Sequence, residues 1–216
     1  NSDRSKKITL MEAGVLFGRA PYSAQDAYFF PLMDRMSTLR ILKGPPAIVY
    51  GPMTVGGAID LVSRGIPDGR KGTYDIAFGQ YGYNREHLSY GMSNEHGGFL
   101  LEGIRIANTG FTDLTRGGTS SFTRSEWMAK GLYIIDPTAK VTNELQLKAT
   151  YSEETSNETY LGITDADARA TPDRRYFASK DDQMNNHRTS LVLTHKVRFS
   201  PDLELTTDVY RHDLKR

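Results

Sequence analysis

The chain has 216 residues, and its 27 Lys and Arg against 26 Asp and Glu leave a formal net charge of +1. This balance provides no basic surface for nucleic acid, and 38% hydrophobic with 25% charged residues excludes both a disordered polymer and a helical membrane protein. The longest uncharged stretch, residues 44–59, holds three prolines and four glycines and is too short and broken for a membrane-spanning helix. The absence of cysteine excludes disulfide frameworks, thiolate metal sites and cysteine nucleophiles.

The region from residue 8 to 66 mixes short apolar runs with Gly and Pro, which is typical of a small α+β unit. We expect strands at residues 8–11, 28–31, 39–42 and 58–62 and one helix near residues 32–37. The chain opens on Asn1 without an initiator Met or an apolar signal segment, and it stops at Arg216 within an alternating run. We therefore expect a fragment of a longer protein, with any targeting signal upstream.

Beyond residues 67–69 the pattern changes to alternating apolar and polar residues, the period of a strand that is wet on one face. The clearest case is residues 144–151, where Leu145, Leu147, Ala149 and Tyr151 share one face. Seven strands are predicted, within residues 74–78, 88–92, 99–107, 124–136, 144–151, 191–199 and 203–209. Apolar residues occur on both faces of 99–107 and 124–136, so the inward face of these two strands stays open.

The connections between these strands alternate in length. Short turns with Asn-Gly or Pro-Asp chemistry are expected at residues 94–97, 136–140 and 200–202, whereas residues 108–122 and 152–185 form long loops. In an up-and-down antiparallel sheet both long loops fall at the same end, which is typical of outer-membrane barrels. A soluble β-sandwich or barrel also alternates apolar and polar residues and remains an alternative. Aromatic residues expected near strand ends favour lipid, namely Trp127, Tyr133, Tyr151, Phe199 and Tyr210.

Residues 39–64 contain a longer motif. It reads Leu39-Arg40-Ile41-Leu42-Lys43-Gly44-Pro45, then Tyr50-Gly51, then Gly56-Gly57 and Ala58-Ile59-Asp60-Leu61-Val62-Ser63-Arg64. This motif resembles the plug signature of TonB-dependent outer-membrane receptors. Residues 20–22, 51–52 and 63–67 look most similar to the ferric dicitrate receptor branch of that family.

The glycines and prolines of the motif have physical roles. Gly44-Pro45-Pro46 ends the preceding strand, because proline cannot continue a β-ladder. Gly51 and the pair Gly56-Gly57 permit positive φ and close backbone approach. A phosphate-binding loop is not supported, because the Gly-Lys-Ser/Thr ending is missing.

The resemblance implies a mainly β fold: the second half of an α+β plug domain at residues 1–69, then about seven antiparallel strands of an incomplete transmembrane β-barrel at residues 70–216. The whole barrel would have about 22 strands around a plugged lumen. The implied function is active transport of ferric siderophore or ferric citrate-like chelates across the outer membrane of a Gram-negative bacterium, not catalysis. Its partners would be outer-membrane lipid and a TonB-type energy-coupling protein, whose contact segment lies upstream. A passive pore and a soluble β-rich ligand-binding domain remain alternatives.

No catalytic group and no cofactor or metal site stands out. The five histidines lack metal-ligand spacing, and Asp165 and Asp167 form only part of a calcium-loop pattern. The resemblance implies that apical plug loops hold the iron chelate, which makes residues 19–28 the candidate loop. Its hydrogen-bonding residues are Tyr22, Ser23, Gln25 and Asp26.

Guanidinium groups are the natural partners of a carboxylate-rich chelate, since they offer paired donors. The longest loop contains Arg174 and Arg175, with Arg169 nearby, and we expect Arg174 and Arg175 to bind substrate. The alternative is that these loops are merely solvated and that neighbouring aspartates neutralise the arginines.

Overall fold

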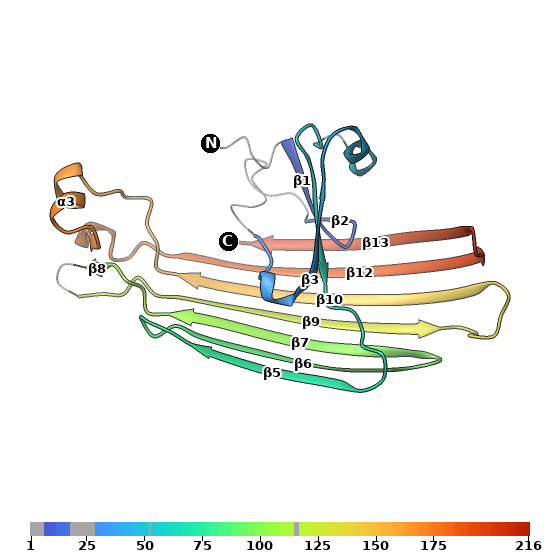
Figure 1. Ribbon diagram of the computed structural model, residues 1–216. Coiled ribbons are helices and arrows are strands. Elements are labelled where there is room, and N and C mark those ends of the chain that lie inside the picture. The colour runs from blue at the N-terminus through green and yellow to red at the C-terminus, as the bar shows by residue number, and fades with distance from the viewer. Residues whose placement is uncertain (1–6, 18–28, 52, 115–116) are drawn as a thin grey trace.

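A computed structural model describes residues 7–17, 29–51, 53–114 and 117–216. It shows a large seven-stranded antiparallel sheet with a smaller four-stranded sheet standing against one of its faces (Figure 1). In these residues no helix is long and apolar enough to cross a membrane.

The large sheet runs up and down, because each strand pairs with its neighbours in the sequence. All seven predicted strands are confirmed. They are β5 (Lys71–Phe78), β6 (Asn84–Asn94), β7 (Gly97–Asn108), β9 (Phe122–Ile134), β10 (Thr142–Ser156), β12 (Met184–Ser200) and β13 (Leu203–Lys215).

Several strands extend further than predicted. The strand β10 has 15 residues and β12 has 17, and the two remain paired from Thr142 with Arg198 to Ser156 with Met184. Continuous backbone pairing carries the ladder beyond the apolar alternation. The expectation that Trp127, Tyr151 and Tyr210 lie near strand ends is therefore wrong, since all three lie well inside strands.

Both long loops lie at one end of the sheet, as expected from their positions in the sequence (Figure 1). The first contains the short strand β8 (Asp113–Leu114). The second contains α3 (Asp165–Ala170), β11 (Arg174–Arg175) and the 3-10 turn η4 (Phe177–Ser179).

The smaller sheet, with its connections, is here called the N-terminal unit. Its strand order is β2-β1-β4-β3, with β1 parallel and β3 antiparallel to β4. A small apolar core of Met11, Ala47 and Ala58 packs with Leu42 and Tyr50. The elements are β1 (Ile8–Glu12), β2 (Val15–Leu16), η2 (Met33–Arg35), β3 (Met36–Leu42), η3 (Pro45–Tyr50) and β4 (Gly57–Ser63).

Three of the four strands predicted here are confirmed, and two expectations are wrong. Residues 29–31 form no strand, and Tyr28 lies outside the described residues. The helix expected near 32–37 is a single 3-10 turn, after which β3 begins at Met36. Pairing of β3 with β4 overrides the local helical pattern, as tertiary context commonly does.

The expectations for the motif glycines are confirmed in part, with positive φ at Gly51 and Gly57 and close backbone approach at Gly56 and Gly57. Gly51 and Gly57 have φ of 106° and 123°. A Cβ added at Gly57 would lie 2.5 Å from the carbonyl oxygen of Leu42, and one at Gly56 would lie 3.1 Å from that of Lys7. The motif therefore permits close backbone approach where β4 begins.

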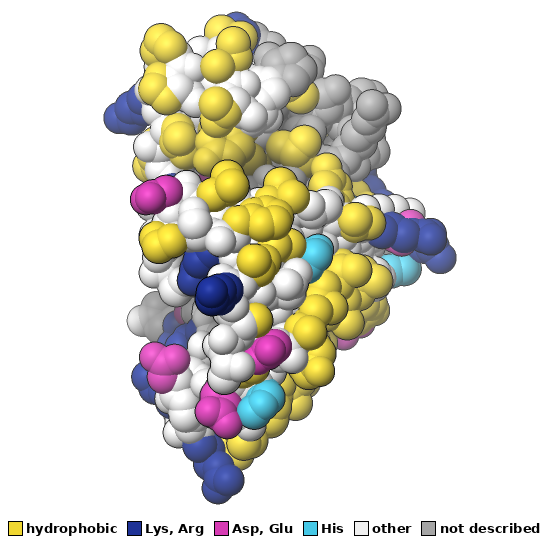
Figure 2. All heavy atoms as spheres, turned by 90° about the vertical axis from the view of Figure 1, so that its right-hand side faces the viewer, with side chains coloured by type: hydrophobic (Ala, Val, Ile, Leu, Met, Phe, Trp, Pro, Cys, Tyr) yellow, Lys and Arg dark blue, Asp and Glu magenta, His cyan; other side chains and the backbone are white. Residues whose placement is uncertain are grey.

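The two faces of the large sheet differ in an unusual way. The face under the N-terminal unit buries charged groups, including Glu102, Glu126, Lys130, Lys148 and Arg188. The outer face exposes large apolar side chains, which form a band along the sheet in Figure 2. A soluble sandwich buries its apolar face, so this sheet has the reverse arrangement.

The structure also shows which face of β7 and of β9 points inward, which the sequence left open. In β7, Leu100 and Ile104 are buried against the N-terminal unit's side, whereas Leu101 is 54% exposed. In β9, Met128 is buried and Trp127 is 55% exposed.

Candidate functional site

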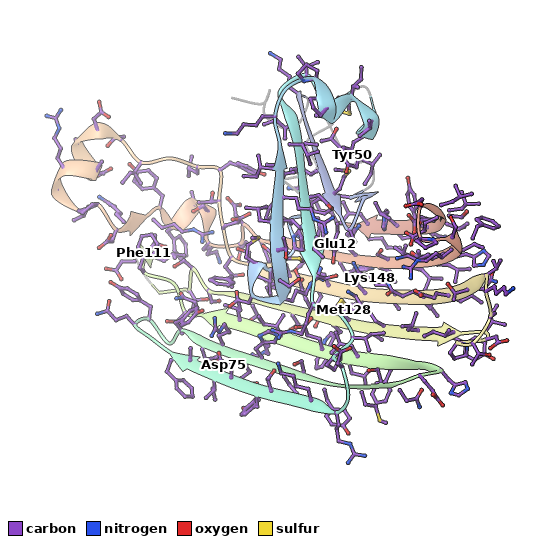
Figure 3. The ribbon with its side chains drawn as sticks, turned by 45° about the vertical axis from the view of Figure 1, so that its right-hand side comes forward. Glu12, Tyr50, Asp75, Phe111, Met128 and Lys148 are labelled. Carbon is purple, nitrogen blue, oxygen red and sulfur yellow. The ribbon has the colours of Figure 1, made fainter. Side chains whose placement is uncertain are left out.

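The N-terminal unit meets the large sheet through a buried charge network centred on Arg35. The Arg35 Nη1 donates to Glu12 Oε1 at 2.8 Å, and Arg35 Nε donates to Glu126 Oε2 at 2.6 Å. From the sheet, Lys148 Nζ donates to the same Glu12 oxygen at 2.6 Å. Figure 3 shows Glu12 and Lys148 at this contact, with Met128 on the neighbouring strand. The N-terminal unit thus contributes Arg35 and Glu12. The large sheet contributes Glu126 and Lys148, and each of these lies against a side chain of opposite charge.

The network controls the protonation of its members. Burial alone would raise the pKa of Glu12, but the positive charges and hydrogen bonds of Arg35 and Lys148 outweigh it and hold that pKa well below its usual range. Burial alone would lower the pKa of Arg35, but the carboxylates of Glu12 and Glu126 raise it above its usual value. Glu12 therefore stays ionised and Arg35 stays protonated at neutral pH.

A second group of contacts lies where the chain leaves the N-terminal unit. The Arg64 Nε donates to Glu102 Oε1 at 2.9 Å, and His87 Nε2 lies 2.8 Å from the same oxygen. The Arg64 carbonyl accepts from Lys130 Nζ at 2.6 Å. The end of β4 is therefore fixed to two strands of the large sheet, β7 and β9, and His87 of β6 shares the Glu102 carboxylate with Arg64.

Aromatic residues form a third contact. The Phe29 ring packs edge-to-face on Phe17, with centroids 5.9 Å apart, and the Arg188 guanidinium lies 4.2 Å from the Phe29 centroid. Two sheet arginines also bond to the backbone here, Arg188 to the Phe17 carbonyl at 3.0 Å and Arg124 to the Phe30 carbonyl. These residues flank the candidate loop 19–28. The predicted ligand residues Tyr22, Ser23, Gln25 and Asp26 lie outside the described residues.

The two long loops are joined into one body. The strand β8 pairs in parallel with β11, and Asp113 N donates to the Asp173 carbonyl at 2.7 Å. Asn157 adds a second link, because its backbone N donates to the Ser121 carbonyl at 2.9 Å and its side-chain amide donates to Ser121 Oγ at 3.1 Å. We call this body the loop module, residues 108–114, 117–122 and 157–183.

The two predicted substrate-binding arginines of the loop module have different environments. The Arg175 side chain is buried and turned into its own loop, where Nη2 donates to the Ser179 carbonyl at 2.6 Å and Nε to Ser179 Oγ at 3.1 Å. The Arg174 side chain is 39% exposed, and its Nη1 donates to Asp167 Oδ1 at 2.8 Å. The structure thus presents Arg174 to solvent, while Arg175 holds the loop together.

The partner of Arg174 is held as a carboxylate. The Tyr176 hydroxyl donates to Asp167, and this bond, with those from Thr164 and Arg174, lowers the Asp167 pKa. The guanidinium of Arg174 also lies over the Tyr176 ring, 5.5 Å from its centroid. The expectation that aspartates neutralise nearby arginines therefore holds for this pair, although one side of Arg174 remains open.

A cavity of about 520 Å³ lies within the loop module. Both loops supply its walls, with Phe111, Phe122 and Leu161 as apolar surfaces and Glu158 and Arg174 as charged ones. Phe111, labelled in Figure 3, is 61% exposed. The volume is within the range of small-molecule sites. No group of three or more His, Asp or Glu side chains able to hold a metal ion occurs in the part of the chain that the structure describes.

Sequence reasoning missed the charge network and the joining of the loops. Glu126 and Lys148 occupy ordinary polar positions of alternating strands, and Glu12 and Lys148 are 136 residues apart. The available signal was the placement of charges on a face that must lie opposite the apolar one.

Comparison with solved structures identifies the architecture. The chain superposes on the unliganded ferric citrate transporter FecA with a TM-score of 0.74 at 18% identity, covering 97% of this chain and 31% of FecA. The chain therefore has the fold of the matched part of this receptor. The siderophore receptor PiuA of Acinetobacter baumannii gives a TM-score of 0.65 at 13% identity, with 96% of this chain and 29% of PiuA covered.

The copper transporter OprC matches less well, with a TM-score of 0.52 at 14% identity and coverage of 96% and 38%. No protein-family model and no curated protein matches the sequence. The chain spans about a third of the length of the solved structures that it matches. Within the described residues the sheet does not close into a barrel.

Proposed function

We propose that the chain is part of an outer-membrane active transporter for ferric siderophore or ferric citrate-like chelates. In this proposal residues 1–69 are the second half of the plug and residues 70–216 are the first strands of the barrel wall. The observation that carries it is the inverted sheet: its apolar face is exposed and its charged face is buried against the N-terminal unit. That arrangement suits a sheet with lipid on one side and a plug on the other.

The same observation weighs against the two alternatives. A soluble domain would expose this apolar band to water, at a large cost in hydration. A passive pore would keep an open lumen, whereas the N-terminal unit covers the charged face and bonds to it at several points.

The loop module is the proposed point of chelate capture. Arg174 supplies a partly exposed side chain beside a cavity large enough for a chelate, and we expect residues 19–28 of the plug to add further ligand contacts. FecA transports ferric citrate and OprC copper, as their names state, so the fold does not fix the cargo. The charged interface then has a mechanical role, because it must rearrange when a TonB-type partner supplies energy.

Binding of radioactive ferric citrate and of ferric catecholate and hydroxamate siderophores to cells that express the full receptor tests this proposal. We expect one of these chelates to bind and to be taken up only in energised cells. The variant Arg174→Ala should weaken binding about tenfold, as expected for loss of one charge-assisted hydrogen bond. The matched control is Arg169→Ala, an exposed arginine of the same loop. Absence of binding for every chelate, or uptake that needs no energy, would contradict the proposal.

A further inference from the structure

The cavity of the loop module borders the inner face of the large sheet. Asn108 and Phe122, which are register partners at the ends of β7 and β9, both line it. Because successive residues of a strand alternate between faces, Asn108 shares a face with Glu102, and Phe122 shares one with Glu126. Both of these glutamates bond to the N-terminal unit. The cavity is therefore on the side of the sheet that faces the N-terminal unit, not on the apolar outer side.

The two arginines that line the cavity are already engaged. The positive charge of Arg174 is matched by the carboxylate of Asp167, and only the exposed side of Arg174 can still donate to an occupant. Arg175 directs all three of its side-chain nitrogens to oxygens of the loop module itself. Neither side chain therefore leaves the cavity with an accessible positive charge that lacks a partner.

The accessible charge of the cavity is the carboxylate of Glu158. This side chain is exposed, lines the cavity and makes no ion pair with any residue that the structure describes. A strongly anionic occupant would meet repulsion from Glu158 without a matching attraction from Arg174 or Arg175. Repulsion of this kind is one of the ways in which a site excludes the wrong ligand.

The rest of the lining is apolar or neutral. Its apolar surfaces are Phe111, Phe122, Leu161 and Ile163. Thr112 adds a hydroxyl group that is buried and makes no hydrogen bond within the described residues. A hydroxyl can both donate and accept, so it can bond to a neutral oxygen of an occupant. The cavity therefore suits an occupant with apolar surface, neutral polar atoms and no excess of negative charge.

Ferric chelates differ in these properties. Each hydroxamate group carries one negative charge, so three of them neutralise the ferric ion. Three catecholates carry twice that charge and leave a strongly anionic complex, and ferric citrate complexes are also anionic because carboxylates are in excess. A linear trihydroxamate also has methylene chains between its hydroxamates, and some of these compounds end in an amine, which is protonated at neutral pH.

We propose that the cavity binds a ferric trihydroxamate that carries a pendant ammonium group. The ammonium would lie toward Glu158, the methylene chains against Phe111 and Leu161, and a hydroxamate oxygen would accept from the exposed side of Arg174. This inference rests on the proposed function, because it names the class of chelate that the proposed capture site takes.

Calorimetric titration of the full receptor in detergent tests the role of the ammonium. The two probes are ferrioxamine B, a linear ferric trihydroxamate that ends in a primary amine, and its N-acetyl derivative, which lacks that charge. We expect ferrioxamine B to bind about fivefold more tightly, as expected for one exposed charge pair. A ferric triscatecholate and ferric citrate should bind at least about tenfold more weakly than either probe, because of charge repulsion.

The variant Glu158→Gln should bind the two trihydroxamates equally. Its binding of the N-acetyl derivative should stay unchanged, which also shows that the variant is folded. The matched control is Asp165→Asn, which removes an exposed carboxylate of the same loop outside the cavity and should keep the preference for the amine. A preference for the amine that survives in Glu158→Gln, or no preference in the unmodified receptor, would overturn the inference.

A second pair of variants tests the apolar wall. Phe111→Ala should weaken binding of both trihydroxamates about fivefold, because it removes apolar contact area. Tyr160→Ala is the matched control, since Tyr160 is 91% exposed in the other loop and does not line the cavity. Equal effects of Phe111→Ala and Tyr160→Ala would show that the chelate does not occupy this cavity.

The choice of chelate separates this inference from the proposed function. A receptor that binds only a catecholate or ferric citrate would refute the trihydroxamate site and leave the transport proposal standing. A receptor that binds none of these chelates would refute both.

Discussion

Arg35 lies between two carboxylates with 3% of its side chain exposed, and both carboxylates depend on it. Replacing it with methionine, Arg35→Met, leaves Glu12 and Glu126 buried with fewer partners. Breaking a buried pair in this way costs about 3–5 kcal/mol. We therefore expect a large fall in the urea concentration at which the N-terminal unit of the full receptor becomes sensitive to protease.

The control for this variant is Arg40→Met in the same unit. Arg40 is 63% exposed and lies 3.6 Å from Asp60, and exposed pairs of this kind contribute about 0–1 kcal/mol. Similar midpoints for Arg35→Met and Arg40→Met would show that the charge network does not hold the unit in place.

The lowered pKa of Glu12 predicts how the contact between the N-terminal unit and the large sheet responds to acid. Because its pKa is lower in the folded protein than in the unfolded chain, its stabilisation is complete above the unfolded value, about 4.3. It is then lost progressively as the pH falls toward the folded pKa. The urea midpoint should therefore drop below about pH 4.3, and Glu12→Gln should be less stable at pH 7 but lose less on acidification. The same acid dependence in both proteins would contradict this assignment.

At the scale of elements, the loop module depends on the ladder between β8 and β11 and on Arg175. Truncation in Arg175→Ala removes the guanidinium that donates to the Asn157 and Asp182 carbonyls, at about 1–3 kcal/mol for each buried group left unpaired, whereas the Ser179 carbonyl keeps its bond from Asp182 N. We expect amide hydrogen exchange to accelerate at least about tenfold in both loops, because they are paired to each other.

Arg174→Ala is the matched control, since Arg174 lies next to Arg175 in the same strand but is partly exposed and bonds chiefly to Asp167. It should reduce chelate binding without accelerating exchange. Faster exchange in both variants, or in neither, would refute the separate roles of the two arginines.

The sequence could predict the strands of the large sheet because alternation of apolar and polar residues repeats for ten or more residues. It could not predict strand ends, since β10 and β12 continue by backbone pairing through Glu153 and Asn186, where the alternation has stopped. Nor could the sequence predict that Arg174 is partly exposed and Arg175 buried, because the two are adjacent residues on opposite sides of a two-residue strand. The helix near 32–37 failed for a related reason, because β3 forms only where β4 is available to pair with it.

At the scale of the molecule, the two faces of the large sheet have opposite requirements. The outer side needs an apolar surface, whereas the inner side needs charges that attach the N-terminal unit without a continuous apolar core between the layers. Charged contacts are strong in this buried interface, yet each can be exchanged for bonds to water if water enters. Under the proposed function, such an interface suits a plug that stays closed at rest and rearranges during transport.

Arg85 offers a direct test of that movement. It bonds to Asp34 of the N-terminal unit and to Asp75 of β5, and all three side chains are at least partly exposed. Residues 1–216 contain no cysteine, so the paired substitutions Asp34→Cys and Arg85→Cys introduce the only thiols in this part of the receptor. A short bis-methanethiosulfonate reagent should then join the unit to the sheet, abolish chelate uptake and leave chelate binding intact, and a reducing agent should restore uptake.

The pair Asp75→Cys and Arg85→Cys is the matched control, because it joins two adjacent strands and leaves the N-terminal unit free. Its cross-linked form should transport normally. If the Asp34 to Arg85 cross-link left uptake unchanged, the unit would not need to move against β6. If both cross-links blocked uptake, the loss would come from the sheet rather than from the plug, because only the first pair restrains the unit.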